Sequence, residues 1–329
     1  MNAKELLADL RSEGRLPSFE GATGWLNSEP LSAESLRGNV VLVDFWTYTC
    51  INWLRTLSYV RAWAEKYGGH GLVVIGVHTP EFPFERDVDN VREAARAMKV
   101  EYPIALDSKY GVWRAFGNQY WPAAYIADSE GRIRHHKFGE GGYEEIERVV
   151  QQLLRDSGRE SVPDDLVPDA GEGLEAQADW ANLETPETYL GYEQAQNFAS
   201  PGGVSPDAGY QIPDGLDLNQ WALEGDWTIG SGAAVLNGSE GSIAFRFHAR
   251  DVNLVMGPAS RGESVPFRVT VDGEAPGAAR GLDTNERGEG TVTQQRLHQL
   301  IRQPGPTGDR TFEITFLEPG VEAYAFTFG

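Results

Sequence analysis

The chain has 329 residues, of which 40% are hydrophobic and 23% charged, a composition typical of globular proteins and of more than one domain. Its formal net charge of −21 argues against nucleic-acid binding, because phosphate neutralisation requires clustered Lys and Arg. No apolar run approaches the roughly 18 residues of a membrane span, and a single cysteine excludes an intramolecular disulfide and a cysteine-rich zinc site. We therefore expect no metal, cofactor, nucleic-acid or membrane partner.

Residues 1–17 mix acidic side chains with leucines and lack the basic start and apolar core of a secretory signal. They predict a short amphipathic helix and a cytoplasmic protein. From there to residue 160, apolar runs alternate with helical patterns. The runs predict the strands Asn39–Trp46, Gly71–His78, Ala123–Ala127 and Ile133–Phe138, and the helical patterns predict the helices Cys50–Tyr67, Val88–Met98 and Tyr143–Leu154. This alternation predicts an α/β domain over residues 1–160, with a mainly parallel sheet and helices on its faces.

Residues 161–193 contain nine acidic residues and no Lys or Arg, which predicts an acidic linker that either extends freely or lies against a domain surface. Residues 194–329 consist of short alternating runs separated by glycine-bearing turns. Asp272-Gly273 indicates a tight hairpin turn, and only Gln294–Arg302 has helical periodicity. The pattern predicts an all-β sandwich, jelly-roll-like, over residues 194–329.

Cys50 follows the strand ending at Trp46 after a short turn and opens the next helix. Unpaired backbone N–H groups and the positive end of the helix dipole favour a thiolate at such a position. We therefore prefer a reactive thiol to the alternative, an inert buried cysteine.

The run Val43–Trp46 (VDFW) followed by Cys50 resembles the thioredoxin signature. The runs Trp46–Asn52 (WTYTCIN) and His78–Phe82 (HTPEF) are more similar to the soluble C-terminal part of DipZ-type proteins, within the thioredoxin-like, TlpA-like, redoxin and AhpC/TSA group. The segment Glu187–Tyr192 (ETYLGY) and the ending AYAFTFG resemble the carbohydrate-binding-module-like β domain of those proteins. The resemblance implies a thioredoxin-like fold for residues 1–160.

One departure from the family pattern concerns its chemistry. The family's enzymes use Cys-X-X-Cys, whereas this chain reads Cys50-Ile51-Asn52-Trp53. Trp53 occupies the resolving position and cannot attack a mixed disulfide, so the ordinary dithiol reductase activity is not implied.

The resemblance also places other residues near the thiol. Asp44 matches the buried thioredoxin carboxylate, where it either influences Cys50 or a bound water, or is structural. Pro122, after Trp121, resembles the cis-proline that faces the thiol, beside which an extended peptide pairs. Thr47 matches part of the peroxiredoxin pattern Pro-X-X-X-Thr-X-X-Cys, in which the hydroxyl orients a peroxide oxygen.

Charged and polar residues elsewhere are weaker candidates. Val43 stands where the peroxiredoxin pattern has proline, and Arg55 and Arg114 are the candidates for lowering the thiol pKa. His78 and Glu81 follow a strand at the expected active edge of the sheet, where they either relay protons, contact substrate or form structural hydrogen bonds. The adjacent His135-His136 pair points to opposite faces of a strand, which argues against a shared metal.

The leading hypothesis is a single-cysteine thiol oxidoreductase with an antioxidant role in cell redox homeostasis. The Cys50 thiolate would attack a peroxide or a disulfide, and an external thiol, either of low molecular weight or a redoxin, would regenerate it. Asp44 and Thr47 complete the expected catalytic set. The expected substrate contacts are Trp46, Asn52, Trp53, His78, Glu81, Trp121 and Pro122.

The sequence also allows other functions for the thiol site and for the second domain. The alternative to an enzyme is a non-catalytic binding module. In this module the Cys50–Pro122 groove holds a peptide or partner, and Trp53 supplies an aromatic contact. A homodimer through Cys50 is chemically allowed. In the second domain Trp221 and Trp227 either bind sugar rings or, as is more common in small β sandwiches, lie in the core.

Overall fold

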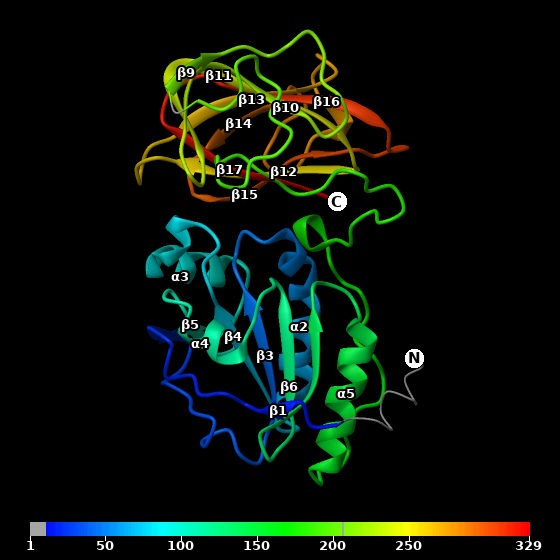
Figure 1. Ribbon diagram of the computed structural model, residues 1–329. Coiled ribbons are helices and arrows are strands. Elements are labelled where there is room, and N and C mark those ends of the chain that lie inside the picture. Colours follow the sequence, from blue (N-terminus) through cyan, green and yellow to red (C-terminus); the bar gives the residue numbers. More distant parts are fainter. Residues whose placement is uncertain (1–10, 206) are drawn as a thin grey trace. The chain divides into compact units, whose positions relative to one another are not determined.

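The computed structural model describes residues 11–205 and 207–329, so residues 1–10 of the expected N-terminal helix lie outside the described residues. Within that expected helix, Gly14–Arg15 is a strand, β1. The chain divides into two compact units, with the boundary between Ala176 and Gln177 (Figure 1). In the part of the chain that is described, no helix has the length and apolar character needed to cross a membrane.

The first unit is built on a seven-stranded sheet with the order β1-β7-β6-β3-β4-β5-β2. Its other strands are β2 (Gly24–Leu26), β3 (Val40–Trp46), β4 (Leu72–His78), β5 (Ile104–Leu106), β6 (Ala123–Ala127) and β7 (Arg132–Phe138). The expectation of a mainly parallel sheet is wrong: β3–β4 and β4–β5 are parallel, and the other four pairs are antiparallel. The turn over residues 128–131 is too short for a crossover, so β6 and β7 must form a hairpin.

Helices cover both faces of this sheet. They are α2 (Ile51–Gly68), α3 (Val88–Ala97), α4 (Gly111–Phe116) and α5 (Tyr143–Asp156), with a 3-10 helix η1 (Pro83–Arg86) before α3. Helix α2 lies against the face that carries Asp44, whereas the rings of Trp113 and Phe116 on α4 pack on Phe45 of the opposite face, at 5.8 and 5.2 Å. The thioredoxin-like α/β domain expected from the sequence is confirmed.

The first part of the acidic stretch packs on the first unit. Arg61 of α2 donates to both carboxylate oxygens of Glu175, at 2.8 and 2.7 Å. The buried carboxylate of Glu147 on α5 accepts the backbone N–H of Val167 at 2.9 Å. Opposite charge and backbone hydrogen bonds therefore fix residues 161–176 on α2 and α5.

The second unit is all-β, as expected. Its strands are β8 (Thr188–Tyr189), β9 (Asp207–Tyr210), β10 (Trp221–Ile229), β11 (Ala234–His248), β12 (Asp251–Pro258), β13 (Val265–Val271), β14 (Glu289–Val292), β15 (Arg296–Arg302), β16 (Asp309–Phe316) and β17 (Val321–Phe328). All of them join one ten-stranded sheet, which Figure 1 shows folded into two layers, with β11, β13 and β16 in one and β12, β15 and β17 in the other. The aromatic core lies between the layers, where Phe245 of β11 contacts Phe326 and Phe328 of β17 at 5.2 and 5.1 Å.

Three details of the second unit bear on the sequence predictions. The helical periodicity of Gln294–Arg302 is misleading, because Arg296–Arg302 is strand β15, paired with β12. Asp272 and Gly273 do form the tight turn, both at positive φ, with Val271 and Glu274 exchanging backbone hydrogen bonds of 2.9 and 3.1 Å. The end of the acidic stretch belongs to this unit, since β8 pairs with β17.

Candidate thiol site

Cys50 lies between β3 and α2, as the N-cap residue of the helix. Its backbone N–H donates to the carbonyl of Thr47 at 3.3 Å, which closes the turn after the strand. The side chain is half-buried, and Sγ lies 3.8 Å from the carbonyl oxygen of Trp121. The thiol therefore faces the backbone of a second segment, 71 residues later in the chain.

That second segment contains the expected proline. The Trp121–Pro122 peptide bond is cis, as the resemblance implied. The indole Nε1 of Trp121 donates to the carbonyl of Thr79 at 3.1 Å, and the carbonyl of Pro122 accepts the N–H of Gly139 at 2.9 Å. Side-chain and backbone hydrogen bonds on either side thus fix the segment beside Cys50.

Trp53 lies inside the first unit and not on its surface. Its ring is fully buried and stacks on Trp46, with centroids 4.3 Å apart and 27° between the planes. Its Nε1 donates to Oδ2 of Asp44 at 2.8 Å. The expected substrate contacts of Trp46 and Trp53 are therefore corrected, because neither ring has exposed surface. The same burial leaves Trp53 no surface for the aromatic contact of the binding-module alternative.

Asp44 is a buried carboxyl group beneath α2, 1% exposed. Burial raises the pKa of Asp44 to about 7, and the hydrogen bond from Trp53 counteracts part of that rise. The indole at the position of the resolving cysteine thus gives this carboxylate a neutral hydrogen-bond donor. The group titrates in the physiological range, so the first unit carries a buried charge that depends on pH.

His78 and Thr47 are also buried. The His78 ring packs edge-on against Trp46 at 4.9 Å and stacks on Tyr48 at 5.7 Å, and burial lowers the pKa of His78 to about 3. It is therefore neutral at physiological pH and offers no contact to substrate. Thr47 is fully buried, and its hydroxyl has no hydrogen-bond partner within 3.5 Å in the described part of the chain; this burial argues against the expected contact with a peroxide.

The remaining candidate site residues are Asn52, Glu81, Arg55 and Arg114. Asn52, in the first turn of α2, and Glu81, after β4, are half-buried. Arg55 forms an ion pair with Glu140 at 3.0 Å, and Arg114 is exposed on α4. Contact of Asn52 and Glu81 with substrate stays a prediction.

Glu85 is the residue that sequence reasoning missed. Its fully buried carboxylate accepts the hydroxyl of Thr49 at 2.6 Å and the backbone N–H groups of Glu81 and Phe82 at 2.6 and 2.9 Å. Burial raises the pKa of Glu85, and these donors oppose the rise. The available signal was an acid three residues into a turn that begins at Phe82, a capping-box position without the usual Ser or Thr.

The two adjacent histidines point apart, as expected. Nδ1 of His136 lies 2.6 Å from Oε2 of Glu13, while Nε2 of His135 lies 3.9 Å from a carboxylate oxygen of Glu145 on α5. Among residues 11–205 and 207–329, no group of three or more His, Cys, Asp or Glu is arranged to hold a metal ion.

The aromatic residues proposed for sugar binding are in the core. Trp221 and Trp227 are fully buried, and each indole Nε1 donates to a backbone carbonyl at 2.8 Å. Neither ring can stack on a sugar, so the core alternative holds for both.

Comparison with known proteins agrees with this architecture. Residues 13–136 match the AhpC/TSA family, and residues 185–329 match the thioredoxin like C-terminal domain. Protein DipZ of Mycobacterium tuberculosis (strain CDC 1551 / Oshkosh) is 40% identical over 262 residues, which cover 78% of this chain and 37% of that protein. The chain thus spans little more than a third of that relative's length.

Two other similarities each cover less than half of this chain. Thiol-disulfide oxidoreductase YkuV of Bacillus subtilis (strain 168) is 29% identical over 142 residues, covering 43% of this chain and 95% of that protein. A solution structure of a thioredoxin-like protein in the oxidised form is 31% identical, covers 45% of this chain and 98% of its own, and has a TM-score of 0.41. The chain thus combines a region similar to the AhpC/TSA family with a region similar to the thioredoxin like C-terminal domain.

Proposed function

We propose that the protein is a single-cysteine thiol oxidoreductase in which Cys50 exchanges with disulfides and an external thiol completes the cycle. The observation that carries this proposal is the position of Sγ, half-buried at the start of α2 and 3.8 Å from the Trp121 carbonyl beside a cis-proline. The AhpC/TSA family match and the named thiol-disulfide oxidoreductase relative support thiol chemistry in this domain.

The proposed cycle has two exchange steps. The Cys50 thiolate attacks one sulfur of a disulfide RS–SR′, forming Cys50–S–S–R and releasing R′S⁻. An external thiolate then attacks the sulfur that carries the R group. This attack releases Cys50 as a thiolate and forms a new disulfide between R and the external thiol. Trp53 cannot perform that second attack, so the mixed disulfide persists until the external thiol arrives. We place this cycle in the cytoplasm, where such thiols are abundant.

Peroxide is the second candidate substrate. The Cys50 thiolate would attack one oxygen of ROOH, breaking the O–O bond to give a sulfenic acid on Cys50 and an alcohol or water. Two external thiols would then reduce the sulfenic acid, releasing water and a disulfide. The fully buried Thr47 weakens this version, because its hydroxyl was the feature that favoured peroxide. Disulfide exchange therefore has the better support.

The test is intact mass measured over time with stoichiometric glutathione disulfide and, separately, hydrogen peroxide. We expect the wild type to gain one glutathione at least about tenfold faster when native than in concentrated urea, with reversal by dithiothreitol and no reaction of Cys50→Ser. Urea exposes the same cysteine without its surroundings, so it is the matched reference.

Each other result assigns a different role. If the protein gains one oxygen faster than it gains glutathione, peroxide is the better-supported substrate. A native thiol that reacts no faster than the denatured one, with both reagents, would contradict the enzyme proposal and favour the non-catalytic binding module. A covalent dimer on non-reducing gels, absent in Cys50→Ser, would establish the homodimer through Cys50.

A further inference from the structure

Glu85 is a buried carboxylate without a role in the proposed exchange. It lies in η1, just after β4, and is fully buried although the next two residues, Arg86 and Asp87, are exposed. Burying a carboxylate is unfavourable unless several donors surround it. The identity of its donors therefore indicates what the buried group does.

The two oxygens of Glu85 bind different parts of the chain. Oε2 accepts the N–H groups of Glu81 and Phe82, which belong to the same loop. Oε1 accepts the hydroxyl of Thr49, 36 residues earlier, at 2.6 Å. A local cap would need only the first set. The second bond ties the loop to the residue that directly precedes Cys50.

The same loop also fixes the segment that faces the thiol. The carbonyl of Thr79 accepts the indole Nε1 of Trp121 at 3.1 Å, and the carbonyl of Trp121 lies 3.8 Å from Sγ of Cys50. Residues 79–85 therefore bond to both sides of the site: to the residue before the thiol, and to the residue whose carbonyl lies opposite it.

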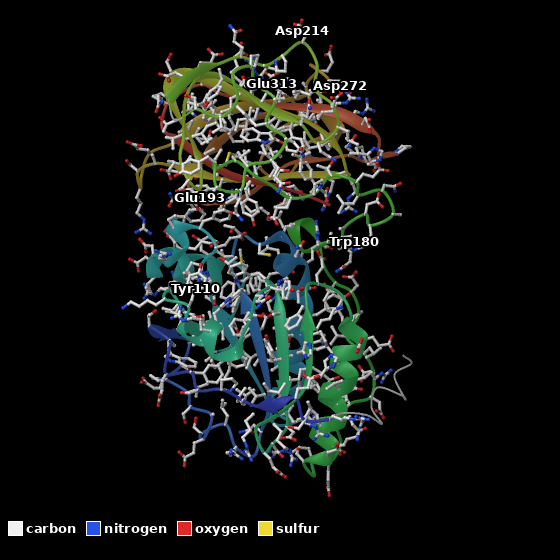
Figure 2. The ribbon with its side chains drawn as sticks, viewed as in Figure 1. Tyr110, Trp180, Glu193, Asp214, Asp272 and Glu313 are labelled. Atoms are coloured by element: carbon white, nitrogen blue, oxygen red, sulfur yellow. The ribbon has the colours of Figure 1, made fainter. Side chains whose placement is uncertain are left out.

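This loop is itself anchored to the body of the first unit. Tyr110, labelled in Figure 2, donates its hydroxyl to the carbonyl of Pro80. The hydroxyl of Thr79 donates to Asp107 at 3.2 Å, and Asp107 also accepts two backbone N–H groups of α4. A loop with these attachments is a fixed support for the residues that bond to it.

The start of α2 is attached to the sheet through Trp53, whose indole donates to Asp44 at 2.8 Å. Cys50 is the N-cap residue, three positions before Trp53. The thiol therefore lies between two attachments: Trp53 in the helix after it, and Thr49 in the turn before it, which is bonded to Glu85.

We propose that Glu85 is a positioning residue for Cys50, acting through the hydroxyl of Thr49 to hold the thiol opposite the Trp121 carbonyl and the cis-proline. This role rests on the proposed function of Cys50. A misplacement of about 1 Å can lower a reaction rate by up to about a hundredfold, so the effect is measurable as a rate.

The test compares three variants by the rate of Cys50 alkylation with iodoacetamide and of exchange with glutathione disulfide. We expect Glu85→Ala to lower both rate constants about tenfold. Glu85→Gln should restore them to within about threefold, because its oxygen can accept the loop amides and its NH2 group can donate to the Thr49 hydroxyl.

The matched control is Glu147→Ala, which removes another buried carboxylate of the first unit. Glu147 accepts the Tyr67 hydroxyl at 2.6 Å and the N–H of Val167, near the C-terminal end of α2. Its loss should lower stability and leave both Cys50 rates within about twofold of wild type. A general loss of stability is thereby separated from misplacement of the thiol.

If Glu85→Ala does not fold, variants of Thr49 test the same hydrogen bond through its donor. Thr49→Val keeps the size of the side chain and removes the donor, and we expect it to slow both reactions about fivefold. Thr49→Ser keeps the hydroxyl and should react at nearly the wild-type rate.

Wild-type rates in folded Glu85→Ala or in Thr49→Val would overturn the proposal, as would an equal slowing in Glu147→Ala. Failure of the proposed function has a different signature: the native wild type would exchange with glutathione disulfide no faster than the denatured chain. The alkylation rates of the variants would still decide whether Glu85 positions the thiol, since alkylation requires no exchange activity.

Discussion

Both units bury tryptophans completely, three in the first and two in the second among the described residues, yet they satisfy the indole N–H groups differently. In the second unit, Trp221 and Trp227 both donate to backbone carbonyls at 2.8 Å. In the first unit, Trp53 donates to the carboxylate of Asp44 at 2.8 Å, whereas Nε1 of Trp46 and Nε1 of Trp63 have no hydrogen-bond partner in the described part of the chain. A carbonyl does not titrate and a carboxylate does. The same kind of buried ring is therefore a fixed support in one unit and part of a pH-dependent pair in the other.

Removing the titratable member should have the largest effect. Folding raises the pKa of Asp44 from 3.8 to about 7, so the folded state binds the proton more tightly and loses this advantage as pH rises from about 4 to 7. Asp44→Asn keeps an acceptor for Trp53 and removes the titration. Between pH 4 and pH 8, the free energy of unfolding of the wild type should fall relative to the variant by on the order of 4 kcal/mol.

The measurement is denaturant unfolding of both proteins across that pH range. A constant difference between wild type and Asp44→Asn would mean that Asp44 titrates in the folded state as it does in the unfolded chain, and the comparison between the two units would lose its basis.

A buried histidine in the second unit tests the opposite pH dependence. Burial lowers the pKa of His298 to about 3, so its contribution is complete above 6.5 and is lost as pH falls toward 3, because the unfolded chain binds the proton first. From pH 7 to pH 4, the wild type should lose on the order of 3 kcal/mol relative to His298→Gln. His78 in the first unit acts in the same direction, so weakening in acid is common to both units.

Parallel curves for wild type and His298→Gln would contradict this account of His298. The appropriate readout is again the free energy of unfolding, since the histidine lies far in sequence from the thiol and is not expected to change its reactivity.

The indole donors themselves are compared by Trp227→Phe and Trp53→Phe. Each removes one N–H and should cost about 1–3 kcal/mol of unfolding free energy from the unsatisfied acceptor, besides the loss of ring area. The cost of Trp227→Phe should not depend on pH. That of Trp53→Phe should increase above about pH 7, where Asp44 is ionised. Equal pH profiles for the two variants would show that the acceptor type makes no difference.

The smallest expected effect concerns the acidic stretch. Arg61 and Glu175 form a bidentate pair whose side chains are 28% and 22% exposed. Arg61→Ala should lower stability by about 1 kcal/mol or less, with the loss shrinking in high salt, and should increase proteolysis within residues 161–176. Arg287→Ala, which breaks the far more exposed pair with Glu289, is the control and should change neither. Unchanged proteolysis in Arg61→Ala would show that the remaining contacts suffice to hold the segment.

Much of the fold was accessible from local pattern. The predicted strand Asn39–Trp46 became β3 (Val40–Trp46), and the helix that opens after Cys50 is α2. Both follow from short-range signals: a continuous apolar run and a helical repeat of apolar residues. The segment Gln294–Arg302 shows where such signals fail, since pairing with β12 outweighs its helical periodicity.

The sequence by itself determined that a single thiol opens a helix after a buried strand, that no second cysteine can resolve a mixed disulfide, and that the two halves differ in architecture. Only the tertiary structure decided the surroundings of that thiol. The bond from Trp53 to Asp44 spans nine residues and that from Thr49 to Glu85 spans 36. Such contacts depend on how helices and loops pack on the sheet. Local residue patterns predict the elements, whereas burial and long-range hydrogen bonds arise only when those elements come together.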